Sequence, residues 1–292
     1  MNLKEVELIS KHKDIINYVS YDYYGKRMAT CSTDHTINIW DVVDAGVDEP
    51  LNYELNNTRT QWIKRTDIVD SRSPVVGIDF AHKREGCKLV ACAIDGIFRM
   101  YECVNPVDLT SWLLKYEVKC DNSCTCISWS ASQMHTPLIA VGTTVSNNHF
   151  NPTGGVYIYQ LKESTKKYQI IKEIPEIKTL VSDIAFASNY GSSYLDLAVA
   201  SKSLYVIRIS TVEDDESINE FTVLKLNNDD VTYNRISWNM MGTILCSSSD
   251  DSCVKFWGGE CKNVLIKTIK CEHRNDSTDK TIKTVNNFSL SV

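Results

Sequence analysis

The stretch "ISWNMMGTILCSSSDDSCVKFWG", residues 236–258, decides the fold because the chain contains its layout twice. Residues 19–41 read "VSYDYYGKRMATCSTDHTINIWD" and have the same length. Each stretch starts with an apolar residue, a serine and an aromatic residue, and has a glycine seven positions in. An aspartate follows, with a tryptophan six residues after it. The chain therefore repeats a structural unit.

Three further units lie between these two. In residues 75–102, Asp95 and Tyr101 stand where the first unit has Asp34 and Trp40. The third unit carries a polar insertion, "TTVSNNHFNPTG", and the fourth lacks the turn aspartate. The ends of successive units lie farther apart than the roughly 40–45 residues of compact repeats of this kind, which indicates surface insertions. The five units span 12–41, 75–102, 124–160, 181–210 and 231–258, and end near Trp40, Tyr101, Tyr159, Ile209 and Trp257.

The periodicity within each unit is that of β-strands. "HTINIW" (35–40) and "SCVKFW" (252–257) alternate apolar and polar residues, with β-branched and aromatic side chains on the apolar phase. Outer strands are expected at residues 168–174 and 220–226. A four-stranded blade cannot bury both faces alone, so the blades must stack radially. The sequence predicts an all-β fold, a β-propeller with five recognisable blades over residues 1–270, with a polar tail at 271–292.

The aspartate and tryptophan of the repeat predict a structural polar network. An aspartate in a tight turn can accept hydrogen bonds from backbone donors, and a histidine and the indole N–H can join it. The first unit offers His12, Asp34 and Trp40 with a hydroxyl from Thr30 or Ser32. A hydrolase triad of His12, Asp34 and Ser32 is the alternative, but recurrence of the pattern favours a structural role. The network residues are His12, Asp34, Trp40, Asp95, Asp251 and Trp257.

Composition excludes several classes of function. The net charge is −6 and no Lys/Arg-rich run occurs, so direct nucleic-acid binding is not expected. No apolar run reaches the roughly 18–20 residues of a membrane span, and the first residues do not resemble a signal peptide. The acidic run at 213–216 is expected to be a solvated loop. No nucleophile–base pair stands outside the repeats, so no enzymatic activity or cofactor is expected.

The cysteines are expected to be reduced thiols. Eleven cysteines are irregularly spaced, which does not suit a disulfide framework. Cys120, Cys124 and Cys126 are close in sequence, but a structural zinc site needs four ligands, usually as two pairs. We therefore favour buried core thiols over a metal site.

The repeats resemble those of WD-repeat proteins, and in particular the SEH-type nucleoporins. The resemblance rests on "VSYDYYGKRMATCSTDHTI", on "SWNMMGTILCSSSDDSCVKFW" and on "GCKLVACAIDGIFRMYECVNPVDLTSWLLKYEV". The "NPVDLTSW" segment, residues 105–112, is a subfamily feature. The resemblance covers roughly residues 12–259 and implies six repeats, one more than we count. A sixth unit after Trp40 is either lost or diverged beyond recognition.

The resemblance also implies a function and a partner. Proteins of this type are scaffold members of the Y-shaped nuclear-pore complex at the nuclear envelope, and support mRNA and protein transport. A helical-solenoid nucleoporin donates a blade to their open ring by β-augmentation. The same type also serves a lysosome- or vacuole-associated nutrient-signalling complex. The docking edges implied here are strands with apolar residues at Val6, Leu8, Ile9, Val264, Ile266 and Ile269.

Three alternatives stay open at this stage. The two edge strands could merely complete the end blades or seal the ring with each other. The chain could be a subunit of the sibling secretory coat, against which residues 105–112 argue. It could also be a peptide-binding WD adaptor, which needs an exposed arginine and aromatic cluster at the rim. The polar tail at 271–292 is expected to be frayed or to bind a partner as a short peptide.

Overall fold

The computed structural model describes residues 11–44, 60–130, 137–145, 153–162, 164–188, 194–211, 218–227, 231–258, 264–270 and 283–285. Apart from the 3-10 turn η1 (Lys83–Glu85), every element in these ranges is a β-strand. None of the helices in the described ranges has the length and apolar character needed to cross a membrane. The all-β prediction is confirmed.

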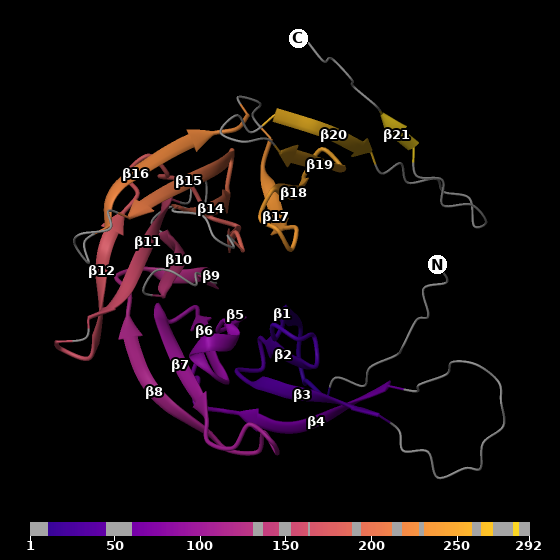
Figure 1. The fold of residues 1–292 in the computed structure, drawn as a ribbon, viewed down its shortest axis with the longest axis vertical. Helices are drawn as coiled ribbons and strands as arrows, with labels where there is room; N and C mark the ends of the chain where they lie inside the picture. Colours follow the sequence, from indigo (N-terminus) through magenta and orange to yellow (C-terminus); the bar gives the residue numbers. More distant parts are fainter. Residues whose placement is uncertain are drawn as a thin grey trace.

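The strands form five antiparallel sheets, which we call blades 1 to 5 (Figure 1). Blade 1 contains β1 (Ile16–Tyr21), β2 (Arg27–Ser32), β3 (Ile37–Asp44) and β4 (Thr60–Ile68). Blade 2 contains β5 (Val75–Phe80), β6 (Lys88–Ala93), β7 (Ile97–Cys103) and β8 (Trp112–Lys119). Blade 3 contains β9 (Ser123–Trp129), β10 (Leu138–Val145), β11 (Thr153–Lys162) and β12 (Lys167–Glu173).

Blades 4 and 5 follow the same order. Blade 4 contains β13 (Asp183–Phe186), β14 (Tyr194–Ala200), β15 (Leu204–Thr211) and β16 (Ile218–Lys225). Blade 5 contains β17 (Tyr233–Trp238), β18 (Ile244–Ser249), β19 (Cys253–Gly258), β20 (Val264–Lys270) and β21 (Lys283–Val285). The five sheets correspond to the five units counted in the sequence, and the described residues form no sixth sheet.

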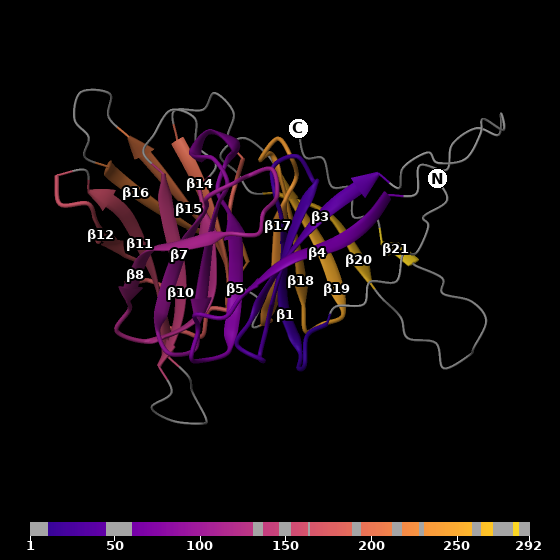
Figure 2. The same ribbon diagram turned by 90° about the horizontal axis from the view of Figure 1, so that it is seen from below.

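The blades are arranged around a central space, with the first strand of each blade innermost (Figure 1). β1 packs against β5, β5 against β9, β9 against β13, and β13 against β17. In the described part of the chain, β17 and β1 have no comparable packing, and Figure 1 shows an opening between blade 5 and blade 1. Seen from below, the strands run between two rims that carry the connections (Figure 2). The propeller is therefore open at one place.

The turn that follows the first strand explains the repeated glycine. In blade 1, Asp22 Oδ1 accepts two backbone N–H groups of the returning chain, over 2.9 and 3.0 Å. In blade 5, Asn239 Oδ1 does the same over 2.8 and 3.0 Å. Gly25 and Gly242 have φ angles of 64° and 67°, a left-handed conformation that favours glycine. The two end blades thus share one turn.

The core consists of apolar clusters between neighbouring blades. We call the face that a blade turns to the next blade its forward face and the opposite one its rear face. Four clusters join blades 1 and 2, 2 and 3, 3 and 4, and 4 and 5. Among the described residues, no such cluster joins blade 5 to blade 1. Cys120, Cys124 and Cys126 are free thiols in these clusters, 4%, 1% and 2% exposed.

Candidate functional site

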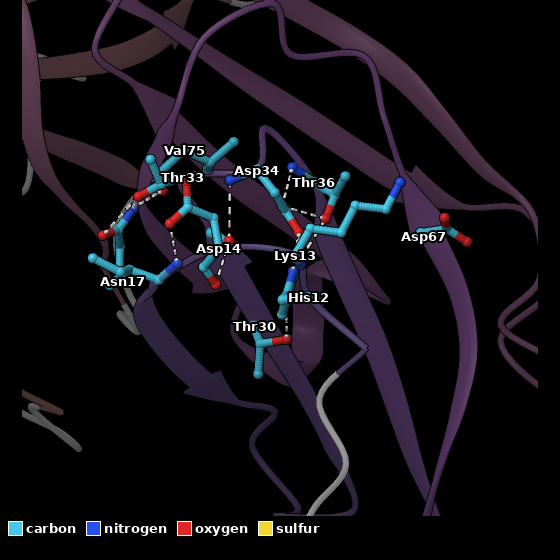
Figure 3. Close-up of polar contacts among 12 residues, drawn as sticks. His12, Lys13, Asp14, Asn17, Thr30, Thr33, Asp34, Thr36, Asp67 and Val75 are labelled. Atoms are coloured by element: carbon cyan, nitrogen blue, oxygen red, sulfur yellow. Dashed lines mark hydrogen bonds and ion pairs between the residues drawn. The ribbon is translucent and has the colours of Figure 1, made fainter.

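The predicted polar network is continuous in blade 1, and Figure 3 shows the part formed by Thr30, His12 and Asp34. The indole N–H of Trp40 donates to Thr30 Oγ1 over 3.1 Å. Thr30 Oγ1 is 2.9 Å from His12 Nε2, and His12 Nδ1 is 3.1 Å from Asp34 Oδ2. A neutral His12 with its proton on Nδ1 satisfies each of these bonds, because Thr30 then donates to Nε2. The network ties the residues that precede β1 to β2, β3 and their turn.

The carboxylate of Asp34 accepts several hydrogen bonds at the turn between β2 and β3. Its Oδ2 accepts the backbone N–H of Lys13 over 2.8 Å, and its Oδ1 accepts the backbone N–H and the hydroxyl of Thr36 over 3.0 and 2.7 Å. Burial alone would raise the pKa of Asp34, but these hydrogen bonds lower it well below its ordinary value. Asp34 is therefore a charged cap for the turn.

The geometry does not suit a hydrolase triad. Ser32 is 0% exposed and donates to the backbone carbonyl of Asp14 over 3.2 Å. Thr30, which bonds to His12, is 2% exposed. A nucleophile must reach a substrate, and neither hydroxyl lies at the surface. The burial of these hydroxyls favours the predicted structural role of His12, Asp34 and Trp40, which stays a prediction.

The other predicted network residues lie in their own blades, away from His12. Asp95 in blade 2 accepts the N–H of Ile97 over 3.0 Å and pairs with Arg99 over 3.3 Å. Asp251 in blade 5 pairs with Lys255 over 3.1 Å. Trp257 donates its indole N–H to a serine of β18, Ser247, over 2.9 Å. In blades 2 and 5, the aspartate is thus neutralised by a basic side chain four residues later in the chain, Arg99 or Lys255.

Side chains of the inner strands also link neighbouring blades, which the sequence analysis missed. Asp79 of β5 accepts the backbone N–H of Trp129 in β9 over 2.8 Å and the hydroxyl of Ser20 in β1 over 3.2 Å. Asp79 thus touches three blades. An isolated aspartate in an alternating strand reads as a solvent-facing residue, so the sequence carries no distinctive signal for this role.

Similar side-chain-to-backbone hydrogen bonds join blades 3 and 4 and blades 4 and 5. Ser128 Oγ of β9 accepts the N–H of Phe186 in β13 over 3.1 Å. Asp183 of β13 accepts the N–H of Ile236 in β17 over 3.0 Å. Burial raises the pKa of Asp79 and of Asp183 to about 6, although hydrogen bonds to both carboxylates act in the opposite direction. The side chains of Asp79, Ser128 and Asp183 thus fix the first strand of one blade against the first strand of the next.

The opening between blade 5 and blade 1, which we call the seam, is bridged at its inner edge by Arg235. Its Nη2 donates to the carbonyl oxygen of Asn17 over 3.1 Å. Its guanidinium lies 4.9 Å from the ring of Tyr18, and its Nη1 is 3.8 Å from Asp183. An open surface depression of about 360 Å³ lies at these contacts, lined by residues 16–19, Asp183 and residues 235–237. Within the described ranges, the side chain of Arg235 thus stands where the other junctions have an apolar cluster.

Among the residues that the structure describes, no other blade packs on the forward face of blade 5. Strand register places Cys246, Val254 and Phe256 at the positions of Ala29, Ile37 and Ile39 in blade 1. The blade 1 residues are 0–1% exposed, and the corresponding ones in blade 2, Val90, Phe98 and Met100, are 0–4% exposed. The three in blade 5 are only half-buried. Ile244 and Ile266, 38% and 47% exposed, extend this surface.

The rear face of blade 1, on the other side of the seam, is covered. Met28, Thr30 and Trp40 are 5%, 2% and 3% exposed. His12 lies against Thr30 and is 1% exposed at its side chain. The seam therefore has an apolar, accessible wall on blade 5 and a closed wall on blade 1.

Of the two predicted docking edges, the structure describes only the second. Val6, Leu8 and Ile9 lie outside the described residues. The other three, Val264, Ile266 and Ile269, lie in β20, which pairs with β19 on one side. On its other side, Thr268–Lys270 pairs with β21, so a strand from the predicted polar tail covers part of that edge. Docking at these strands stays a prediction.

Comparison with known proteins identifies the family. The model of the WD domain, G-beta repeat, matches residues 3–41 and 221–258. Nucleoporin SEH1 of Osmerus mordax is 35% identical over 302 residues, covering 86% of this chain and 82% of that protein. Nucleoporin SEH1-A of Xenopus laevis and Nucleoporin SEH1 of Homo sapiens are 34% and 33% identical, each covering 86% of this chain and 83% of their own. The chain belongs to the SEH1 nucleoporin family. The sequence-based recognition is confirmed.

The alignment with the SEH1 proteins also bears on the blade count. It is 302 positions long although it spans only 86% of a chain of 292 residues. The alignment must therefore open gaps in this chain, and their summed length is close to the spacing between the ends of successive repeat units. This agrees with five sheets where the resemblance implied six repeats.

A solved structure supports the fold alone. The crystal structure of Saccharomyces cerevisiae Sqt1 superimposes with a TM-score of 0.60 at 12% identity, covering 88% of this chain. The SEH1-family chain spans 63% of that structure, so it matches less than two thirds of it. At this identity the similarity concerns the propeller and not its function.

Proposed function

We propose that this chain is a structural scaffold subunit of the nuclear pore complex, where it supports the transport of mRNA and protein. Membership of the SEH1 nucleoporin family supports the assignment to the nuclear pore. The polar groups of blade 1 support a non-enzymatic role, because the hydroxyl that contacts His12 is buried. The chain acts by holding other subunits.

The seam is the proposed docking site for a helical-solenoid nucleoporin that supplies a blade. The observation that carries this proposal is the half-buried forward face of blade 5. In blades 1 to 4, the forward face packs against the rear face of the next blade. The matching occupant of the seam is thus another blade, with an apolar rear face to cover Val254 and Phe256.

The same site limits how many assemblies one copy can join at a time. The family resemblance also implies a lysosome- or vacuole-associated complex that regulates nutrient signalling. A single seam can hold a single donated blade. We therefore propose that one copy of the chain serves the nuclear pore or that second complex, but not both together.

Affinity purification of the tagged protein tests the proposal. We expect other members of the Y-shaped nuclear-pore complex to co-elute. Phe256→Asp places a charge on the forward face of blade 5 and should abolish their recovery. Leu113→Asp is the matched control, because Leu113 is 51% exposed on β8, away from the seam. Recovery of secretory coat subunits alone, or of no stable partner, would overturn the proposal.

A further inference from the structure

A pocket of about 320 Å³ lies between blade 2 and blade 3, at the edge of the apolar cluster that joins them. Tyr116 of β8 lines it from blade 2, and Trp129 of β9 and Tyr168 of β12 line it from blade 3. Its volume is near the lower end of the roughly 300–1,000 Å³ of small-ligand pockets. The pocket therefore has room for one residue of a peptide but not for a helix.

The indole N–H of Trp129 is a buried donor without an acceptor. Trp129 is 5% exposed, and among the residues that the structure describes its Nε1 has no hydrogen-bond partner. The equally buried Trp40 and Trp257 both donate their indole N–H groups to a hydroxyl of the neighbouring strand. A buried donor that makes no hydrogen bond destabilises the folded chain. A ligand that brings an acceptor to Trp129 removes this cost.

The equivalent positions in other blades show that this N–H is not needed for packing. Strand register places Trp129 at the position of Phe80 in blade 2 and of Trp238 in blade 5. Phe80 fills its position with an apolar ring. Trp238 donates its indole N–H to the carbonyl oxygen of Ala185 in the preceding blade over 3.0 Å. In the described part of the chain, the indole N–H of Trp129 serves neither purpose.

Two tyrosine rings form further walls of the pocket. The rings of Tyr116 and Tyr168 lie 5.3 Å apart at an angle of 87°. The Tyr168 hydroxyl donates to Met100 Sδ over 3.3 Å, and the Phe98 ring meets Tyr168 nearly edge-on at 5.9 Å. Aromatic side chains pack favourably in such edge-to-face arrangements. An aromatic group of a ligand can therefore join the same cluster of rings.

Four charged side chains at the pocket neutralise one another. Lys88 Nζ lies 3.5 Å from the carboxylate of Glu85, and Lys115 Nζ lies 3.1 Å from that of Glu102. The lining thus contains two positive and two negative groups. A charged ligand would either break these pairs or meet a group of its own sign. The pocket therefore favours a ligand without net charge.

We propose that this pocket binds one aromatic residue of a peptide segment of a partner protein, whose neutral backbone carbonyl accepts the indole N–H of Trp129. Every peptide residue combines an amide carbonyl with a side chain, which are the two groups that the pocket lacks. The aromatic side chain packs against Tyr116 and Tyr168. The carbonyl reaches the covered indole when the flexible side chain of Met100, which lines the same pocket, moves aside. This site is separate from the seam and does not depend on docking there.

NMR titration of the purified, ¹⁵N-labelled chain with N-acetyl-phenylalaninamide tests the site. This probe carries an aromatic ring between two neutral amides. We expect the indole N–H signal of Trp129, assigned by its absence in Trp129→Phe, to move downfield because its proton gains a hydrogen bond. The indole signal of Trp238 is the internal control and should not move, because its N–H already donates to Ala185.

Two related probes test the chemistry of the ligand. N-acetyl-alaninamide lacks the ring, and N-acetyl-phenylalanine carries a carboxylate. Each should bind with a dissociation constant at least roughly tenfold higher than that of N-acetyl-phenylalaninamide.

Variants of the pocket test the roles of its walls, with binding followed at the backbone amides of β8. Trp129→Phe keeps a ring like that of Phe80 and should raise the dissociation constant roughly fivefold through the lost hydrogen bond. Tyr116→Ala removes one wall and should raise it roughly tenfold. Tyr21→Ala is the matched control, because Tyr21 is 55% exposed in blade 1. It should leave the dissociation constant within about twofold of wild type.

Each other outcome overturns the proposal without affecting the seam. If no signal of the pocket moves up to the solubility limit of N-acetyl-phenylalaninamide, the pocket is not a binding site. If Trp129→Phe binds this probe as tightly as wild type, the indole N–H is not the anchor. Equal binding of N-acetyl-phenylalanine would contradict the preference for a neutral ligand. If the probe binds and the capped peptide Ala-Ala-Phe-Ala-Ala does not, the pocket takes a small aromatic amide instead of a peptide.

Discussion

Arg235 Nη2 donates a hydrogen bond to the carbonyl oxygen of Asn17 over 3.1 Å and thereby connects the last blade to the first. The other four junctions each contain an apolar cluster of buried residues. A single exposed hydrogen bond contributes only about 0.5–1.5 kcal/mol, far less than such a cluster. The ring is therefore weakest at the seam.

Arg235→Ala should loosen the seam without unfolding the chain. The change removes the bond to Asn17 and the contact with the ring of Tyr18. We expect faster amide hydrogen exchange in β1 and β17, with β9 unchanged. Arg208→Ala is the control, because Arg208 pairs with Asp196 inside blade 4 over 2.8 Å. If Arg235→Ala accelerated amide exchange equally in all five blades, Arg235 would not act locally at the seam, and the prediction would be contradicted.

His12→Ala should destabilise blade 1. It leaves the buried hydroxyl of Thr30 and the carboxylate of Asp34 without a shared partner. A buried polar group that loses its partner costs about 1–3 kcal/mol, so we expect a loss of about 2 kcal/mol in the free energy of unfolding by urea denaturation. His35→Ala, in an exposed turn position, should change it by less than about 0.5 kcal/mol. Equal losses in the two variants would argue against the network.

Asp79→Asn should flatten the dependence of stability on pH. Burial raises the pKa of folded Asp79 to about 6, against an ordinary value of 3.8. Between these values the folded state holds the proton more tightly than the unfolded state, so stability falls as pH rises through this window. Asp183 acts in the same direction. The stability of Asp79→Asn relative to wild type should therefore rise from pH 4 to pH 7 in urea denaturation, and a falling difference would contradict the burial of Asp79.

Cys246 should be more accessible to alkylation than the thiols in the covered clusters. It is half-buried on the forward face of blade 5, whereas Cys31, Cys92 and Cys126 are 0–2% exposed. Burial raises the pKa of each of these thiols, which slows all of them. Mass spectrometry after limited N-ethylmaleimide treatment should find Cys246 modified before the other three. Modification of Cys92 or Cys126 first would show that the forward face of blade 5 is covered.

The fold could be predicted from sequence because its signals are local. The aspartate or asparagine and the glycine of each turn, and the tryptophan of the third strand, recur at fixed spacing in the first and last units. Asp34, His12 and Trp40 could be grouped for the same reason. The blade count could also be obtained, since each unit contains its own alternating strands.

The links between blades could not be predicted, because they join residues far apart in the chain. Asp79 and Trp129 are separated by fifty positions, and Arg235 and Asn17 by 218. Asp79, Arg235 and Asn17 are ordinary polar residues in strands, and Trp129 takes part only through its backbone N–H, so no repeat marks these links. The exposure of Phe256 could not be predicted either, since its apolar character fits a covered blade equally well. Only the missing neighbour in the structure distinguishes it from Ile39.

Hydrogen exchange of the complex with the co-purifying nuclear-pore partner tests the central claim most directly. The account predicts that the partner slows amide exchange in β18 and β19 of blade 5 and in β1 across the seam. β6 and β7 of blade 2, already enclosed by neighbouring blades, should be unchanged. Slowed exchange confined to other blades, with β18 and β19 unaffected, would contradict docking at the seam.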